Sequence, residues 1–229
     1  MKHLLPLLVL IACASAPVSR GRTPAEMHAL TVQIRTTCAT PDPDFVSTGD
    51  PVADGLLKVL LPDVESAYGG SGLLVSQDRL LTNGHVVTCE PPSELRSILI
   101  NDGDGELRPA HVELLLPRRD IARVQLDVPL KKHVPRPVIG PRPATGDRLC
   151  YSSALPIQQV RCGDVQPNDN PKSGSIYVDA LVMHGSSGSS AYVDGRLVGL
   201  VYATLDCGEG GLCIGAVTPI DDALAWLLP

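Results

Sequence analysis

The segment most informative about the fold is GSSGSSAYVDGRLVGLVYAT, residues 185–204. It opens with a glycine- and serine-rich run around Ser187 and continues as two strand-like runs separated by a turn at Asp194-Gly195. A Gly/Ser run by itself is also typical of a flexible linker. Strand-like runs stand immediately on both sides here and leave no separate domain to link, so we interpret the run as a structured loop.

Short runs of the same kind recur along the chain, from Leu30–Thr37 to Ile214–Thr218. The 21 glycines and 21 prolines favour many turns and short elements over long helices. Asp102-Gly103-Asp104-Gly105 lies between two such runs and predicts a hairpin. The pattern predicts an all-β antiparallel barrel or sandwich.

Two segments differ from this pattern. Ala39–Gly69 is rich in Pro and Asp, and we interpret it as a long loop with a short element at Leu56–Leu61. The end of the chain predicts a helix capped by Thr218, with Pro219 in the first helical position and acidic residues in the first turn.

The amino terminus reads as an export signal over residues 1–16, followed by a tether over 17–29 and the folded domain over 30–229. Lys2 and His3 precede an apolar run, Leu4–Ala12, that is too short to span a bilayer comfortably. A buried strand or helix at the start of a cytosolic domain is the alternative interpretation.

Two kinds of export fit this segment. Leu10-Ile11-Ala12-Cys13 resembles a bacterial lipobox, in which Cys13 is lipidated and anchors the chain without a transmembrane helix. The other cleavage point follows Ala14-Ser15-Ala16, but it places Pro17 first after the cut. We therefore expect a periplasmic or cell-envelope lipoprotein, or a secreted protein.

The cysteine count agrees with export. Without Cys13 the seven cysteines become six, enough for three disulfides, and six cysteines allow 15 connectivities. Local spacing favours three pairs among these: Cys207 with Cys213, Cys150 with Cys162, and Cys38 with Cys89 as the remainder. No cysteine or histidine spacing suggests a metal site. The net charge of −6, without a dense basic run, weighs against nucleic acid or an anionic membrane surface as a partner.

Three polar residues carry the chemistry, namely His85, Asp120 and Ser187. A serine hydroxyl is a poor nucleophile at neutral pH unless an imidazole takes its proton. A carboxylate orients that imidazole and stabilises the imidazolium that forms. The glycines around Ser187 allow backbone N–H groups to face a developing oxyanion.

The contexts of these residues are TNGHVV (82–87), RDIA (119–122) and DALVMHGSSG (179–188). In this order they resemble the signature blocks of trypsin-like serine peptidases, most of all the bacterial high-temperature-requirement (Deg-type) branch, here without a PDZ domain. The likeness also includes GDRL (146–149) and IGAVTPI (214–220), so it extends from about Gly70 to the end.

The resemblance implies two packed six-stranded β-barrels, with a boundary near residues 130–145, a short C-terminal helix and a catalytic cleft between the barrels. It makes His85 the general base, Asp120 its orienter and Ser187 the nucleophile. The remaining implied roles are an oxyanion hole from the N–H groups of Gly185 and Ser187, and substrate contacts from Leu181, Tyr202, Ala203 and Thr204.

The chain departs from the family pattern near the nucleophile. Ser189-Ser190 replaces the usual Gly-Pro, and Ser186 replaces the Asp that animal trypsins pair with a freed N-terminus. Val201 stands where Glu-specific relatives carry a His. Leu181 and Thr204 together suggest a preference for a small apolar residue before the scissile bond.

We therefore expect an exported serine endopeptidase that acts on protein or peptide substrates and uses no cofactor. A non-catalytic module that binds a peptide or partner in the same cleft is the main alternative. A serine esterase is a third interpretation, although Ser189 replaces the last Gly of the Gly-x-Ser-x-Gly elbow.

Overall fold

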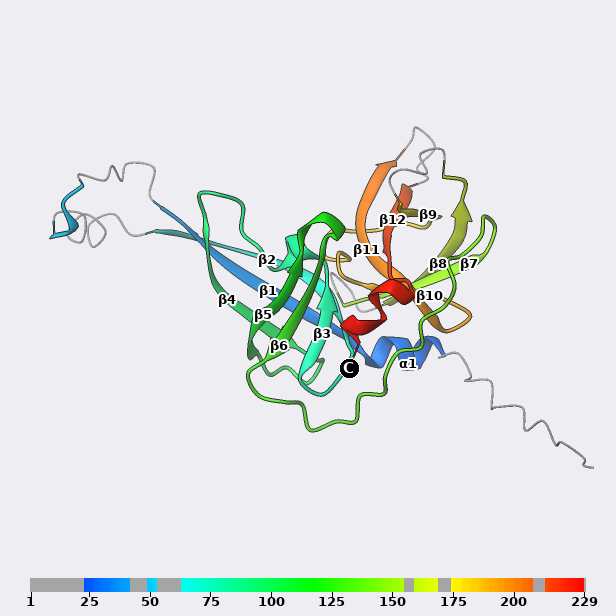
Figure 1. The fold of residues 1–229 in the computed structure, drawn as a ribbon, viewed down its shortest axis with the longest axis horizontal. Helices are drawn as coiled ribbons and strands as arrows, with labels where there is room; N and C mark the ends of the chain where they lie inside the picture. Colours follow the sequence, from blue (N-terminus) through cyan, green and yellow to red (C-terminus); the bar gives the residue numbers. More distant parts are fainter. Residues whose placement is uncertain are drawn as a thin grey trace, which may run out of the picture.

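A computed structural model shows two closed six-stranded antiparallel barrels, as predicted (Figure 1). It describes residues 23–41, 49–52, 63–154, 159–168, 174–207 and 213–228, with the backbone alone for 203–207, 213, 222 and 223. The strand order is β1-β2-β3-β6-β5-β4 in the first barrel and β10-β11-β12-β9-β8-β7 in the second.

The first barrel follows a short helix, α1 (Pro24–Ala29). Its strands are β1 (Thr31–Thr40), β2 (Val64–Leu74), β3 (Arg79–Thr82), β4 (Glu94–Asn101), β5 (Arg108–Leu116) and β6 (Ile121–Leu126). Two 3-10 turns interrupt this order, η1 (Gly84–Val86) after β3 and η2 (Pro117–Arg119) before β6. The hairpin predicted at Asp102–Gly105 joins β4 to β5, which pair in antiparallel register.

The second barrel begins after a connecting segment that follows Leu126. Its strands are β7 (Arg148–Ser153), β8 (Gln159–Gln166), β9 (Ile176–Asp179), β10 (Ser190–Val193), β11 (Arg196–Cys207) and β12 (Cys213–Pro219). The chain continues into the terminal 3-10 helix η4 (Asp222–Leu227).

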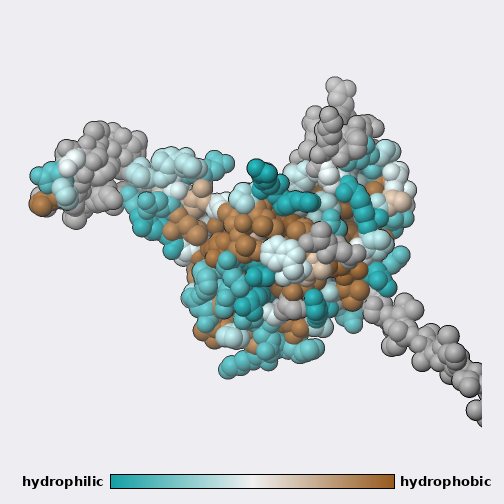
Figure 2. All heavy atoms as spheres, in the orientation of Figure 1, coloured by the Kyte–Doolittle hydropathy of each residue, from teal (hydrophilic) through white to brown (hydrophobic). Residues whose placement is uncertain are grey.

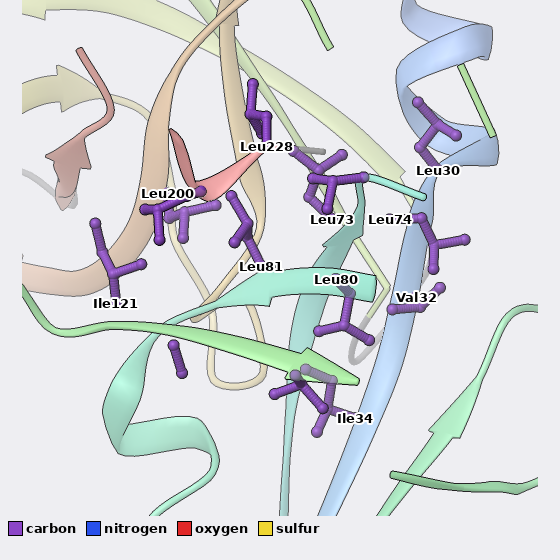
Figure 3. Packing of buried hydrophobic residues seen from close by; sticks show 14 of the residues in the cluster. Leu30, Val32, Ile34, Leu73, Leu74, Leu80, Leu81, Ile121, Leu200 and Leu228 are labelled. Carbon is purple, nitrogen blue, oxygen red and sulfur yellow. The ribbon is translucent and has the colours of Figure 1, made fainter. Parts of the chain in front are cut away.

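The larger hydrophobic core fills the first barrel and continues into the contact between the barrels. Leu200 of the second barrel and Leu228 after the terminal helix belong to the same buried cluster as Leu73 and Leu81 of the first barrel (Figure 3). Full burial of one such side chain contributes about 1.5–3 kcal/mol. The shared core therefore holds the two barrels in a fixed relation, and the cleft between them depends on it.

The structure corrects the interpretation of Ala39–Gly69 as a long loop. β1 continues to Thr40 and β2 begins at Val64, so both ends of that segment form a hairpin that projects from the first barrel (Figure 1). The first six residues of β2 are exposed, which removes the apolar alternation that marks a half-buried strand. Leu56–Leu61 lies outside the described residues.

Two other boundaries differ from the prediction. Thr218 and Pro219 belong to β12, where they pair with Leu200 and Gly199, and the terminal helix starts only at Asp222. Ladder pairing in the sheet takes precedence over the capping signal. Part of the predicted tether, Pro24–Ala29, is a helix with a capping box between Thr23 and Glu26.

Two of the three predicted disulfides are confirmed, Cys38–Cys89 in the first barrel and Cys150–Cys162 across β7 and β8. The side chains of Cys207 and Cys213 lie outside the described residues, although their backbones stand opposite each other in the β11–β12 ladder. The signal segment and Cys13 also lie outside. Within the described ranges, no helix has the length and apolarity needed to cross a membrane.

Candidate active site

A cavity of about 790 Å³ lies between the barrels and is lined by two of the three predicted catalytic residues. The first barrel contributes His85 and the second contributes Ser187. The remaining lining residues are Tyr68, Gly69, Val86, Val182, Met183, His184, Gly185 and Tyr202.

His85 and Asp120 form a directly hydrogen-bonded pair at one side of this cavity. Nδ1 of His85 lies 2.7 Å from Oδ2 of Asp120, and the backbone N–H of His85 donates to Oδ1 at 2.9 Å. Asp120 ends η2 with a left-handed φ of 50°, a conformation that Asp tolerates better than most residues. Both carboxylate oxygens thus hold one histidine, which fixes the orientation of the ring and leaves its Nε2 free to act as a base.

Asn83 links this pair to the nucleophile loop, a role that the sequence did not reveal. Its side chain is fully buried, donates from Nδ2 to the Asp120 carbonyl at 2.9 Å and accepts the N–H of Gly188 at Oδ1 at 2.7 Å. Asn83 stood in the quoted motif with His85, but its partners lie 37 and 105 residues away. No local signal could have identified them.

Ser71 is the second link between the barrels. Its backbone N–H donates to the Ser187 carbonyl at 2.8 Å, and its hydroxyl donates to the Gly185 carbonyl at 2.8 Å. The same hydroxyl accepts the N–H of Ala154 at 3.0 Å. The nucleophile loop is thus held by a strand of the opposite barrel.

The backbone before Ser187 forms a turn that presents two free donors. The N–H of Ser186 donates to the Met183 carbonyl at 2.9 Å and Gly185 has a φ of 87°, the features of a type II turn. The N–H groups of Ser186, Gly188 and Ser189 are all bonded inside the protein. In the described part of the chain, those of Gly185 and Ser187 have no such partner.

Gly188 is required by the close approach of this loop to β2. Its φ is +84°, and an added Cβ would lie 2.0 Å from the Ser71 carbonyl oxygen and 2.2 Å from Oγ1 of Thr82. No other residue fits there without moving the loop away from the first barrel. The glycine after the nucleophile therefore sets the distance between the two halves of the site.

The Ser187 hydroxyl donates to the Tyr202 carbonyl at 3.2 Å. Among the described residues, Nε2 of His85 has no hydrogen-bond partner. The cavity thus contains a hydroxyl, a free imidazole nitrogen and two free backbone donors, which are the groups that acyl transfer requires.

The structure places only some of the residues expected to contact substrate at the cavity. Tyr202 lines the cavity, whereas the side chains of Ala203 and Thr204 lie outside the described residues. Leu181 is 47% exposed and is not among the described lining residues, although its neighbour Val182 is. The Leu181 carbonyl accepts from the Tyr151 hydroxyl, whose pKa is raised by burial, so that group remains a donor.

The departures around the nucleophile have distinct surroundings. The buried Ser186 hydroxyl lies 3.3 Å from that of Ser153, so a serine pair occupies the position where animal trypsins bury a charged Asp. The hydroxyls of Ser189 and Ser190 are buried and have no hydrogen-bond partner in the described residues. Two polar groups therefore lie unsatisfied directly behind the loop.

Comparisons with known proteins agree with this fold. The Rv3671c protease in its inactive form has 18% identity and a TM-score of 0.59, with 89% of each chain covered. A serine-to-alanine mutant of Rv3671c from M. tuberculosis H37Rv, also inactive, has 17% identity and a TM-score of 0.59 over 90% of this chain and 94% of that one.

A variant of the HtrA-type protease AlgW, solved with a decapeptide, has 21% identity and a TM-score of 0.61 over 86% of this chain and 63% of that one. At these identities the likenesses establish the fold alone. No curated protein gives a significant match. The family model of the trypsin-like peptidase domain matches residues 70–200, more than half of the sequence. The chain therefore belongs to the trypsin-like peptidase family.

Proposed function

We propose that this peptidase is an exported serine endopeptidase that works through an acyl-enzyme on Ser187. The observation that carries the proposal is the composition of the interbarrel cavity. There the His85–Asp120 pair faces the nucleophile loop, and the only loop N–H groups left free among residues 185–189 are those of Gly185 and Ser187.

Acylation begins when Oγ of Ser187 attacks the carbonyl carbon of the scissile peptide bond and gives its proton to Nε2 of His85. Asp120 stabilises the resulting imidazolium through Nδ1. The negative charge on the substrate oxygen is accepted by the two free N–H groups, each of which contributes about 10²–10³ to the rate in comparable sites.

The tetrahedral intermediate then breaks its C–N bond, and His85 returns the proton to the leaving nitrogen. Water enters, loses a proton to His85 and attacks the ester carbonyl on Ser187. Collapse of this second intermediate breaks the bond between the carbonyl carbon and Oγ of Ser187, His85 returns its proton to Oγ, and the acid product leaves. The cycle regenerates the Ser187 hydroxyl and the neutral His85 ring, so the reaction needs no cofactor.

Export is supported by the two disulfides, because such bonds persist mainly in oxidising compartments. We propose that the signal segment directs the chain outside the cytoplasm, that Cys13 carries the lipid anchor and that Cys207 pairs with Cys213. Metabolic labelling with palmitate tests the anchor. The native chain should incorporate label and Cys13→Ser should not; label retained by the variant would place the modification elsewhere.

The test of the proposed reaction is cleavage of a reduced, alkylated protein such as casein by the purified full-length chain. Ser187→Ala should abolish cleavage, whereas Ser190→Ala, a matched change three residues away, should retain it. A folded native protein that cleaves neither casein nor a broad peptide mixture would contradict the proposal and favour a binding module.

A further inference from the structure

A second hollow adjoins the active-site cavity on the outer face of the first barrel. It has a volume of about 430 Å³, and we call it the leaving-side groove. The residues that matter here are Arg35, Ala67, Tyr68, Gly69, Leu99 and Leu107. Tyr68 and Gly69 line both this groove and the active-site cavity, so the two hollows lie side by side.

The alternation of β1 places Arg35 on the outside of the barrel. Its neighbours Ile34 and Thr36 are fully buried, whereas Arg35 is exposed. The pairing register puts Arg35 opposite Gly69 on β2 and opposite Leu99 on β4. Because glycine and the nearby Ala67 have little or no side chain, they leave the hollow that the Arg35 side chain borders.

The free edge of β2 can guide a peptide from Ser187 into this groove. Ser71 uses that edge to donate its N–H to the Ser187 carbonyl, and Gly69 lies two residues earlier, so its polar groups face the same side. In the described structure β3 pairs with β2 only at Leu73 and Leu74. An extended peptide that leaves Ser187 can therefore pair with the Gly69 backbone.

Arg35 differs from the other arginines on the strands of this barrel. Arg79, Arg96, Arg108 and Arg123 each pair with a carboxylate. Within the described part of the chain, Arg35 has no carboxylate partner. Arg35 lines the groove together with Leu99, which is partly exposed, and Leu107, which is 47% exposed. The polar residues Gln33 and Asn101 line it as well. Figure 2 shows apolar residues gathered between the projecting hairpin and the second barrel.

We propose that the leaving-side groove binds the substrate segment beyond the scissile bond and that Arg35 selects an Asp or Glu side chain there. The proposal rests on the proposed peptidase function and adds a substrate class to it. Gly69 lies two residues before Ser71 on β2, a distance of about 7 Å along the strand. Arg35 lies opposite Gly69 on the neighbouring strand, a further distance of about 5 Å. We therefore place the acidic residue about two to four positions after the cleaved bond.

The test is the sequence profile of products that the full-length protein releases from a proteome-derived peptide mixture. Native protein should enrich Asp and Glu at positions two to four after the cut, by about tenfold, as expected for one charge-assisted hydrogen bond. Arg35→Gln should lose this enrichment and Arg35→Glu should favour Lys and Arg instead. Lys131→Glu makes the same charge change outside both cavities and should leave the native profile unchanged.

Three results would overturn the proposal: an unchanged profile in Arg35→Glu, the same change in Lys131→Glu, or enrichment confined to peptides with a free terminal carboxylate and lost on amidation.

A binding measurement that needs no catalysis separates this proposal from the peptidase function. In Ser187→Ala, a peptide with Glu in the leaving segment should bind about tenfold more tightly than its Gln counterpart, and Arg35→Gln should remove the difference. Equal affinities would contradict the role of Arg35 even if cleavage were established.

Discussion

The two barrels supply the candidate site in different ways. The first barrel contributes a pair of side chains, His85 and Asp120, joined by hydrogen bonds of 2.7 and 2.9 Å next to the larger core. The second contributes the Ser187 hydroxyl and a backbone turn whose conformation leaves the N–H groups of Gly185 and Ser187 free. Proton transfer thus depends on side-chain chemistry, whereas stabilisation of the oxyanion depends on a peptide orientation.

The largest expected effect comes from breaking the side-chain half. Asp120→Asn keeps the shape but replaces the charge that orients His85, and should lower kcat by about 10⁴. Steady-state kinetics on a peptide substrate measure this loss. Asp127→Asn is a matched control, because Asp127 holds His111 at 2.8 Å on the same barrel outside the cavity. Equal losses in both variants would refute the role of Asp120.

Each barrel contains one described disulfide, and the two should contribute differently to the free energy of unfolding. Cys38–Cys89 closes a separation of 51 residues and Cys150–Cys162 one of 12. In the chain-entropy model, the loss of the first bridge should lower the free energy of unfolding by about 4 kcal/mol and the loss of the second by about 3 kcal/mol. Urea unfolding of the paired Cys→Ala variants measures both values, and the reverse order would contradict this assignment.

The backbone half is tested by Gly185→Ala. A Cβ at a φ of 87° costs about 1–2 kcal/mol and favours a type I turn, whose central peptide is flipped. The Gly185 N–H would then leave the oxyanion position, and kcat should fall by about 10² with little change in KM. A native kcat in this variant would show that the turn does not supply the donor.

The smallest expected effect lies behind the nucleophile loop. The Ser190 hydroxyl is buried and has no hydrogen-bond partner in the part of the chain that the structure describes, so Ser190→Ala removes a desolvated polar group and leaves no cavity of note. We expect the free energy of unfolding to rise by about 1 kcal/mol with activity unchanged. Thermal unfolding checks this, and a clear loss of stability would mean that the hydroxyl has a partner after all.

Much of the fold could be predicted because its signals are local. The contexts of His85, Asp120 and Ser187 placed these residues in one family and in the right chain order. Asp102–Gly105 predicted the hairpin between β4 and β5 because the residues that favour a hairpin turn lie within the turn itself. Where paired residues are close in sequence, as with Cys150 and Cys162, spacing was informative.

The rest of the site could not be predicted because it depends on distant partners. Residues 64–69 of β2 are exposed and rich in small side chains, so they gave no strand pattern. Asn83 and Ser71 acquire their roles only when the barrels meet. Asn83 is 105 residues from its partner Gly188, and Ser71 is 114 residues from its partner Gly185. The position of Arg35 beside the cleft likewise follows from the pairing of β1 with β2, not from its neighbours in sequence.

The proposed reaction requires base, nucleophile and oxyanion donors to be assembled in one cavity. Labelling of the purified native chain with a fluorophosphonate, followed by mass spectrometry of the modified peptide, reports this assembly. We predict one adduct per chain, located on Ser187, and none in Ser187→Ala. A folded native protein that takes no label, or takes it on another residue, would contradict the assembled site.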